Sequence, residues 1–405
     1  MRNTRRRFLG GLACTTAGLM TLGCRRDQAP ASQAPGEGEP AAAAAVAAPR
    51  PEDFAEKSLL VLGGTGFLGP HVVEAALAQG WTVTLFNRGK TNPDMFPDLE
   101  KLRGDRDGKL EALEGRRFRA VIDTSGYVPR VVRQSAELLA PNVGQYMFVS
   151  SVSAYADFTK MGIDETYGVA QLEDPTVEDV PQFYGGLKAA CEATVEEVLP
   201  GRTTNVRPGL IVGPGDPTDR FTYWPARIDQ GGEILSPGTP DDPIQVIDAR
   251  DLAAWMIGAL EQVHTGVYNL VGPFPPTTIG ALLDTCVAQA KTPGSLVWAD
   301  KDFLEANEVA PWMQMPVWVP PGAEGYEGFA QIDATRAKDT GLKTRSLEET
   351  VRDTLAWWRE LPEDRRGKMR AGISRERETE LLAAWRNAEA KAKAQAAAPL
   401  RIFAA

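Results

Sequence analysis

A tyrosine and a lysine stand four residues apart, at Tyr184 and Lys188, in the sequence Tyr-Gly-Gly-Leu-Lys. Residues with this spacing lie on one face of an α-helix, so the phenol and the ammonium group would be neighbours. A free tyrosine has a pKa of about 10 and is a poor base at neutral pH. A nearby lysine favours the phenolate and would make Tyr184 a usable acid or base. The same spacing also fits a partly buried tyrosine beside a solvated lysine.

Hydroxyl side chains gather in a second segment, residues 150–155, with the sequence Ser-Ser-Val-Ser-Ala-Tyr. The segment follows a strand-like run at residues 145–149. A hydroxyl at the end of a strand can hydrogen-bond to a carbonyl or alcohol oxygen of a substrate. Serines after a strand also form turns and helix caps, so this segment alone leaves both interpretations open.

Three glycines follow the first apolar run with the spacing Gly63-x-x-Gly66-x-x-Gly69. A strand, a glycine turn and a helix in that order are typical of a dinucleotide-binding site, although an ordinary βα turn is the alternative. Gly63 would allow the tight turn, Gly66 would let the backbone approach a pyrophosphate, and Gly69 would let the helix pack close to the strand. The helix N-terminus would then offer free N–H groups to the phosphates.

The chain around these motifs alternates between short apolar runs and segments with helical spacing. Strands are predicted at residues 58–62, 81–86, 120–123, 145–149 and 204–207, and helices at residues 71–77, 131–139 and 184–198. This alternation predicts an α/β fold with a doubly wound parallel Rossmann sheet.

The order and spacing of the motifs resemble those of the extended short-chain dehydrogenase/reductases, the group of NAD-dependent epimerases and dehydratases, over roughly residues 57–360. The markers are the glycine motif at 63–69, the Asp105 region, residues 150–155, Tyr184-x-x-x-Lys188, and the segments 207–216 and 247–253. The resemblance implies that Ser151, Tyr184 and Lys188 are catalytic, and that Lys188 also binds the nicotinamide ribose. It implies cofactor-binding roles for Gly63, Gly66, Phe67, Leu68, Gly69, Asn87, Arg88, Asp105 and Lys188.

The resemblance also suggests how the chain is divided. We expect an NAD(P)-binding Rossmann domain with the catalytic residues at 56–215, a smaller C-terminal substrate-binding subdomain with closing helices at 216–360, and a charged helical tail at 361–405. An acidic segment, residues 164–179, lengthens the interval between Ser151 and Tyr184 and would lie at the substrate mouth. The side chains of Trp312, Met315, Pro316 and Trp318 fit either a substrate pocket or ordinary packing. Arg220 fits either a contact with an anionic substrate group or a salt bridge.

The cofactor is expected to be NAD(P), with a preference for NADP. Many NAD enzymes of this family have an acid at the end of the second strand, which binds the ribose hydroxyls. This chain has Asn87 there, followed by Arg88 and Lys90. A cation at this place can accept a 2′-phosphate. Asp105 matches the adenine-side acid of the family.

The resemblance implies hydride transfer between nicotinamide C4 and a carbinol carbon of a sugar or sugar derivative. Residues 85–90 look most like an atypical subgroup that includes chloroplast RNA-binding relatives. A plain NADP-dependent dehydrogenase or reductase, and a non-catalytic nucleotide- or RNA-binding protein, therefore remain alternatives. The net charge of −10 argues against nucleic acid as a partner. With only two histidines, the sequence argues against a hydrolase triad or a histidine zinc site, and no metal is expected.

The N-terminus is interpreted as a targeting segment. Residues 4–9, Thr-Arg-Arg-Arg-Phe-Leu, resemble a twin-arginine export signal within residues 1–24, and residues 21–24 partly resemble a lipoprotein cleavage box ending at Cys24. Residues 25–55 are predicted to be a flexible linker rich in alanine and proline. We expect export by the twin-arginine translocase to the periplasm or to a lipid anchor at Cys24, the chain's only expected membrane contact. Whether Cys24 is lipidated and whether the protein forms oligomers stay open. An exported enzyme would have to carry a tightly bound cofactor with it.

Overall fold

The computed structural model describes residues 48–54, 56–292 and 294–396. The predicted export signal and most of the predicted linker therefore lie outside the described residues. Within the described ranges, no helix has the length and apolar character that a membrane span requires. Cys191 and Cys286 are both buried and unpaired.

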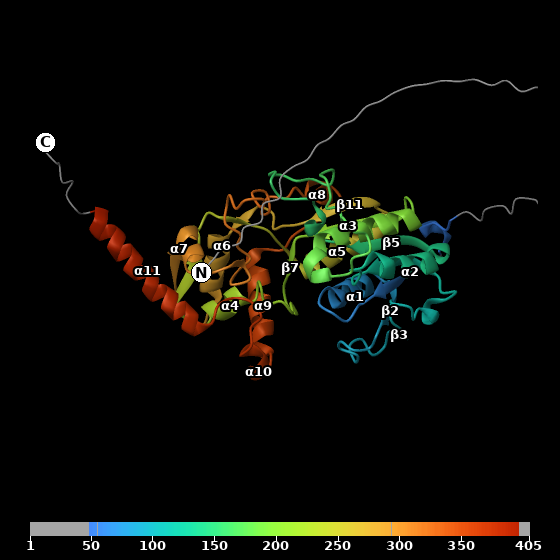
Figure 1. Ribbon diagram of the computed structural model, residues 1–405. Coiled ribbons are helices and arrows are strands. Elements are labelled where there is room, and N and C mark those ends of the chain that lie inside the picture. Colours follow the sequence, from blue (N-terminus) through green and yellow to red (C-terminus); the bar gives the residue numbers. More distant parts are fainter. Residues whose placement is uncertain (1–47, 55, 293, 397–405) are drawn as a thin grey trace, which may run out of the picture. The chain divides into compact units, whose positions relative to one another are not determined.

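The first part of the fold is built on a seven-stranded sheet, and every neighbouring pair of its strands is parallel (Figure 1). The strand order is β11-β6-β5-β4-β1-β2-β3. The strands are β1 (Ser58–Leu62), β2 (Thr82–Asn87), β3 (Glu100–Arg103), β4 (Phe118–Asp123), β5 (Val143–Val149), β6 (Thr203–Pro208) and β11 (Gly266–Leu270). The predicted doubly wound parallel sheet is confirmed.

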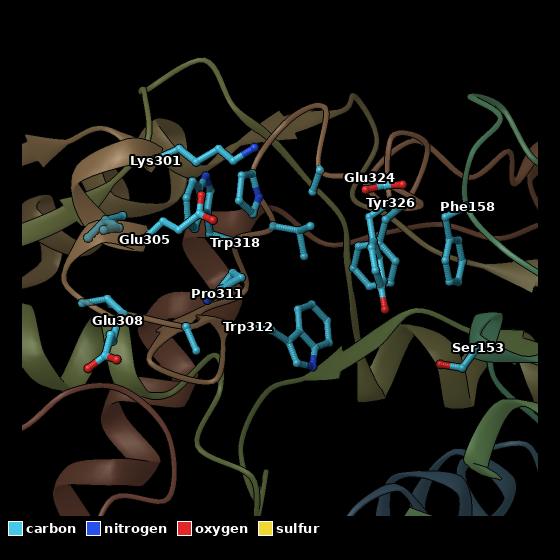
Figure 2. Close-up of a pocket in the computed structure, with 17 residues that line it drawn as sticks. Ser153, Phe158, Lys301, Glu305, Glu308, Pro311, Trp312, Trp318, Glu324 and Tyr326 are labelled. Atoms are coloured by element: carbon cyan, nitrogen blue, oxygen red, sulfur yellow. The ribbon is translucent and has the colours of Figure 1, made fainter. Parts of the chain in front are cut away.

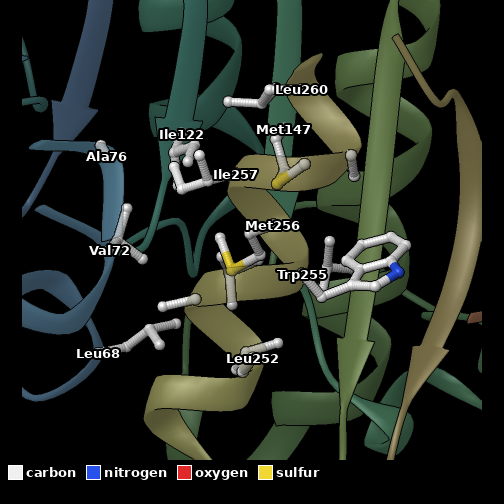
Figure 3. Packing of buried hydrophobic residues seen from close by; sticks show 14 of the residues in the cluster. Leu68, Val72, Ala76, Ile122, Met147, Leu252, Trp255, Met256, Ile257 and Leu260 are labelled. Carbon is white, nitrogen blue, oxygen red and sulfur yellow. The ribbon is translucent and has the colours of Figure 1, made fainter. Parts of the chain in front are cut away.

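Helices cover both faces of this sheet, which is why β1 is a continuous apolar run. Leu59 and Val61 face one side and belong to the same core as helices α1 (Leu68–Ala78) and α5 (Ala249–Glu261). Leu60 and Leu62 face the other side, against helices α2 (Pro129–Leu139) and α3 (Val180–Val198). Figure 3 shows the first of these layers, with α5 packed against α1 and the sheet.

The chain runs from β1 to β2 and β3 on one side, and then returns to β4 on the other side of β1. Connections from β1 and β4 therefore leave in opposite directions. Ligands of open parallel sheets bind at such a switch point, outside the carboxyl ends of the strands. The glycine motif follows β1 at this point.

Two elements of the sheet layer come from beyond residue 215, where the sequence analysis placed the end of the Rossmann domain. Helix α5 and strand β11 both lie within residues 216–360. The reason is the apolar face of α5, which buries Leu252 and Met256 against α1 and the sheet. The chain thus returns to the seven-stranded sheet and its helices before the C-terminal part of the fold is complete.

A second core lies in the C-terminal part, around the parallel strand pair β8 (Gly232–Pro237) and β13 (Gly294–Ala299). The predicted charged tail contributes to it. Helix α11 (Arg375–Ala396) buries Leu381 and Leu382, and its Glu378 forms an ion pair of 2.7 Å with Arg227 of α4 (Tyr223–Ile228). The first half of α11 is therefore part of the fold, whereas residues 386–394 are exposed.

The remaining elements include α6 (Ile279–Gln289) and α9 (Leu347–Glu360), which contribute side chains to the second core, and several shorter elements. The other helices are α7 (Lys301–Ala306), α8 (Thr335–Asp339) and α10 (Glu363–Arg366). The strands are β7 (Leu210–Val212), β9 (Pro243–Ile244), β10 (Val246–Asp248), β12 (Thr277–Thr278), β14 (Pro311–Trp312) and β15 (Met315–Pro316). Single 3₁₀ turns are η1 (Pro51–Asp53), η2 (Glu111–Leu113), η3 (Ala140–Asn142) and η4 (Val152–Ala154).

Candidate active site

A cavity of about 790 Å³ opens at the switch point, above the carboxyl ends of β1, β2, β4 and β5. All the predicted cofactor-binding residues line it: Gly63, Gly66, Phe67, Leu68, Gly69, Asn87, Arg88, Asp105 and Lys188. Tyr184 lines it as well, together with Ser150. The fold therefore brings these residues from five separate segments of the sequence to one cavity.

The glycine motif has the geometry that its spacing predicts. Gly63 has a φ of +113°, which side chains rarely permit. A Cβ on Gly69 would lie 2.5 Å from the Cα of Gly64, so only glycine allows α1 to start this close to the turn. A Cβ on Gly66 would meet no atom within 4 Å, because this position faces the cavity.

These two glycines give a matched pair of variants. Gly66→Ala is expected to fold with its unfolding free energy changed by less than about 0.5 kcal/mol, and to bind dinucleotide at least about tenfold more weakly, because the methyl group enters the cavity. Gly69→Ala is expected to lose about 1–3 kcal/mol of stability through overpacking. Urea denaturation and cofactor titration of both variants check this. Equal losses of stability in both would contradict the assignment of Gly66 to the ligand.

The end of the cavity near β2 is basic. Asn87 accepts hydrogen bonds from the backbone N–H of Gly89 and from Arg103, so its side chain organises this turn. Arg88 and Lys90 are exposed and line the cavity. The ion pairs of the described residues include neither of them. Asp105 lines the cavity nearby, and its carboxylate accepts the N–H of Asp107 at 3.2 Å.

Tyr184 and Ser151 come together although 33 positions separate them. Ser151 follows β5, caps η4 by accepting the N–H of Ser153 at 3.1 Å, and interacts with the phenol of Tyr184. The close approach depends on Gly185, because a Cβ there would lie 2.1 Å from the carbonyl oxygen of Ser153. The acidic segment 164–179 packs against the same two elements, where Leu172 contacts α3 and the N–H of Ala170 donates to η4.

The electrostatics of Tyr184 differ from the prediction. Burial raises the pKa of Tyr184 above its usual value, while the Ser151 hydroxyl and the Arg220 guanidinium act in the opposite direction. Lys188 is not among the groups that shift the pKa of Tyr184. Its ammonium group is buried and donates to the carbonyl oxygens of Gly126 and Val149, each at 2.7 Å. The expected depression by Lys188 was therefore wrong.

The surroundings of Lys188 are unusual for a charged group. Burial lowers the pKa of Lys188 to about 8, and Asp123 acts in the opposite direction. The ammonium nitrogen lies 4.8 Å from the ring centre of Tyr127 and 4.7 Å from that of Phe148. Lys188 still lines the dinucleotide cavity, so it remains available to a ligand there.

Three residues that the sequence reasoning missed contribute to the site. The ring of Tyr127 lines the cavity 6.5 Å from the ring of Tyr184. The hydroxyl of Ser150 is buried, lines the cavity and has no hydrogen-bond partner within the described residues. Gly185 permits the contact of α3 with η4. Ser150 and Gly185 lie within the sequence motifs, but the motifs assign roles only to the neighbouring residues Ser151 and Tyr184. No local sequence pattern marks Tyr127.

A second cavity, of about 930 Å³, lies on the far side of η4 and is shown in Figure 2. Ser153 marks the end nearest the Tyr184 site, and Lys301 and Glu305 mark the other end. Trp312 and Trp318 line this cavity, whereas Met315 and Pro316 are buried beside it. The guanidinium of Arg220 lies 5.0 Å above the ring of Trp312. No carboxylate of the described ranges forms an ion pair with Arg220, so the salt-bridge alternative for Arg220 is not supported there.

The sheet is doubly wound and has a glycine-lined cavity at its switch point. Tyr184 and Ser150 also line this cavity. These features define a dinucleotide-binding α/β protein. Residues 59–271 match the model of the NAD dependent epimerase/dehydratase family. The chain belongs to this family.

The chain is also similar to individual known proteins. It is 27% identical over 318 residues to a dTDP-6-deoxy-L-talose 4-dehydrogenase (NAD(P)(+)) of Kitasatospora kifunensis, covering 72% of this chain and 93% of the relative. It is 26% identical over 238 residues to the chloroplast stem-loop binding protein of 41 kDa b of Arabidopsis thaliana, covering 54% of this chain but only 59% of that protein. The crystal structure of human epimerase family protein SDR39U1 with NADPH has a TM-score of 0.52 and 20% identity, covering 74% of this chain and 99% of that one.

Proposed function

We propose that this protein is an NAD(P)-dependent oxidoreductase that moves a hydride to or from a carbinol carbon of a sugar or sugar derivative, with Tyr184 as the proton donor or acceptor. The observation that carries the proposal is the interaction of Ser151 with Tyr184, whose phenol lines the glycine-lined cavity. The similarity to a dTDP-sugar dehydrogenase supports the sugar class.

The residues of the first cavity fit a nicotinamide dinucleotide. Helix α1 begins at Leu68, and its N-cap Phe67 provides no side-chain cap, so the N–H groups of Leu68 and Gly69 are available to an anion. Gly66 leaves room for a pyrophosphate. Ser150 contributes a buried hydroxyl that lacks a partner within the described ranges. When bound, a nicotinamide supplies the hydride acceptor or donor.

The protein's own residues would then handle the proton and the oxygen. Tyr184 gives its phenolic proton to the oxygen of a carbonyl substrate, or takes the hydroxyl proton of an alcohol substrate. Ser151 donates a hydrogen bond to the same oxygen and holds it beside the phenol. Lys188, held by two carbonyl oxygens beneath Tyr127, would bind the ribose hydroxyls with the remaining donor of its ammonium group.

We propose that NADP is preferred over NAD, and the basic end of the cavity supports this preference. Arg88→Ala is expected to weaken NADP binding by about 10- to 100-fold, the value of a charge-assisted hydrogen bond, and to leave NAD binding unchanged. Cofactor titrations of the variant check this, with Arg117→Ala as a control, since Arg117 is exposed and lies away from the cavity. An equal loss for both cofactors would argue against recognition of a 2′-phosphate.

We further propose that the chain is exported by the twin-arginine pathway with its cofactor already bound. The motivation is the combination of the motif at residues 4–9, outside the described part, with the dinucleotide cavity. Because free NAD(P) is not expected to be replenished outside the cytoplasm, turnover would be redox-neutral on one retained cofactor. Native purification from the cell envelope followed by mass spectrometry tests both the cofactor and its retention. A protein that carries no nicotinamide nucleotide and needs it in stoichiometric amounts would contradict the proposal.

A further inference from the structure

We propose that the second cavity takes an uncharged saccharide, and not a sugar attached to a nucleoside diphosphate. This inference rests on the proposed function, because it names the substrate class for the Tyr184 site. Its evidence is the combination of aromatic rings, carboxylates and position that the cavity between η4 and α7 presents (Figure 2).

Aromatic side chains form one wall of this cavity. The rings of Phe158, Trp312 and Tyr326 all surround Phe329, with ring centres 5.0, 5.2 and 6.0 Å from it. Tyr326 is 51% exposed, a large fraction for a side chain inside an aromatic cluster. The electron-rich face of such a ring attracts the weakly positive C–H groups of a pyranose. A half-buried Trp312 and an exposed Tyr326 therefore offer stacking surfaces for sugar rings.

The charges of the cavity disfavour a diphosphate. Its lining carries three exposed carboxylates, Glu305, Glu308 and Glu324, and one exposed cation, Lys301. The guanidinium of Arg220 adds a second positive charge beside Trp312, so the carboxylates still outnumber the cations. Like charges near a protein surface repel by about 1 kcal/mol or more per pair at short distance. The same carboxylates are good acceptors for the hydroxyl groups of a neutral sugar. A nucleoside diphosphate would bring at least two further negative charges into this rim, whereas an uncharged saccharide would not.

The aromatic cavity also adjoins the Tyr184 site across η4. The η4 turn separates it from the dinucleotide cavity, with Ser150 lining the dinucleotide cavity and Ser153 lining the aromatic one. Arg220 spans the same boundary, since its guanidinium stacks on Trp312 and its charge acts on Tyr184. A sugar ring that rests on Trp312 would thus have its terminal hydroxyl groups directed toward Ser151 and Tyr184.

The total volume of about 930 Å³ lies at the upper end of the range of small-molecule sites. The far end, at α7, holds Glu305 and Lys301. This end is therefore polar, and it can both accept hydrogen bonds from hydroxyl groups and donate hydrogen bonds to them. A single hexose would use only the end near Ser153. The geometry therefore favours an oligosaccharide or a glycoside over a monosaccharide.

The test uses the full protein with its bound cofactor and two sets of probes. One set contains uncharged di- and trisaccharides, including maltotriose and cellobiose, and the other contains UDP-glucose and UDP-N-acetylglucosamine. Binding is followed by tryptophan fluorescence, which Trp312 and Trp318 report. We expect an uncharged member to bind at least about tenfold more tightly than either nucleotide sugar. A nucleotide sugar that binds more tightly than every uncharged probe, or a lack of binding by all uncharged probes, would overturn the proposal.

Two sets of variants attribute the binding to this cavity. Trp312→Ala should abolish saccharide binding, and Trp312→Phe, which keeps a ring, should restore most of it. A triple change of Glu305, Glu308 and Glu324 to glutamine is at the surface and should fold normally. It should raise the affinity for UDP-glucose by about tenfold at low salt, because the repulsion is removed. No change in that affinity would contradict the charge argument.

Failure of this inference is distinguishable from failure of the proposed function. If UDP-glucose binds preferentially and changes the redox state of the bound nicotinamide, the oxidoreductase stands and the saccharide class is wrong. If the purified protein holds no nicotinamide nucleotide and none can be loaded, the oxidoreductase itself is wrong.

Discussion

Tyr184→Phe is expected to lower the rate of hydride transfer by about 10²- to 10⁴-fold, the usual contribution of a general acid or base. The ring and its packing are retained, and only the phenolic oxygen beside Ser151 is lost. Cofactor binding should stay within about threefold of the original, because the glycine motif and the basic end of the cavity are untouched. The rate is measured as single-turnover reduction of the bound cofactor by a saccharide that binds in the tryptophan-fluorescence titrations.

The matched control is Tyr127→Phe. The ring centre of Tyr127 lies 6.5 Å from that of Tyr184 in the same cavity, but Tyr127 forms no hydrogen bond with Ser151 among the described residues. Loss of the Tyr127 hydroxyl should change the rate of hydride transfer by less than about tenfold. A fully active Tyr184→Phe protein would favour a non-catalytic binding role. A larger effect of the Tyr127 change than of the Tyr184 change would indicate that Tyr127 is the proton donor or acceptor.

The raised pKa of Tyr184 sets the pH dependence of the same step. Since burial raises this pKa above 10, the phenol is protonated at neutral pH, which suits the donation of a proton to a carbonyl substrate. Oxidation of an alcohol needs the phenolate, so its rate should rise about tenfold per pH unit through the neutral range. Arg220→Leu removes a charge that lowers this pKa and should shift the profile to higher pH. A flat profile for oxidation would contradict Tyr184 as the base.

The glycine motif could be predicted from sequence because its physics is local. A turn with positive φ, a close contact between α1 and Gly64 and an open position at Gly66 all arise within seven consecutive residues. The alternation of apolar and polar segments predicted five strands of the sheet for the same reason. Strand β3 was missed because Glu100–Arg103 is short, polar and not buried. Strand β11 was missed because its membership depends on the return of the chain after residue 215.

The position of Lys188 shows the limit of this reasoning. Helical spacing correctly places Tyr184 and Lys188 on one helix, but it does not fix where a long flexible side chain ends. The ammonium group goes to two carbonyl oxygens, at Gly126 and Val149, which lie 62 and 39 positions away in the chain. The aromatic cavity likewise combines η4 with residues 301–329, and no pattern within either segment reveals the other.

A buried ion pair beneath the dinucleotide cavity carries the largest expected effect on stability. Asp123 ends β4 and is fully buried. It accepts two hydrogen bonds from Arg106, at 2.6 and 2.7 Å, and one from the hydroxyl of Tyr146, at 2.9 Å. It also acts to raise the pKa of the buried Lys188. The network thus connects the fold of the sheet with the charge of the site.

Asp123→Asn is expected to lower the free energy of unfolding by about 3–5 kcal/mol, because it leaves the guanidinium of Arg106 buried without a countercharge. Urea denaturation measures the loss. Tyr146→Phe removes one neutral donor and should cost only about 1 kcal/mol. The double change of Arg106→Met with Asp123→Leu removes both charges and should recover most of the stability, since well-packed apolar groups often replace a buried ion pair without loss. If the double variant is no more stable than Asp123→Asn, the cost lies in the packing of β4 and not in the unpaired charge.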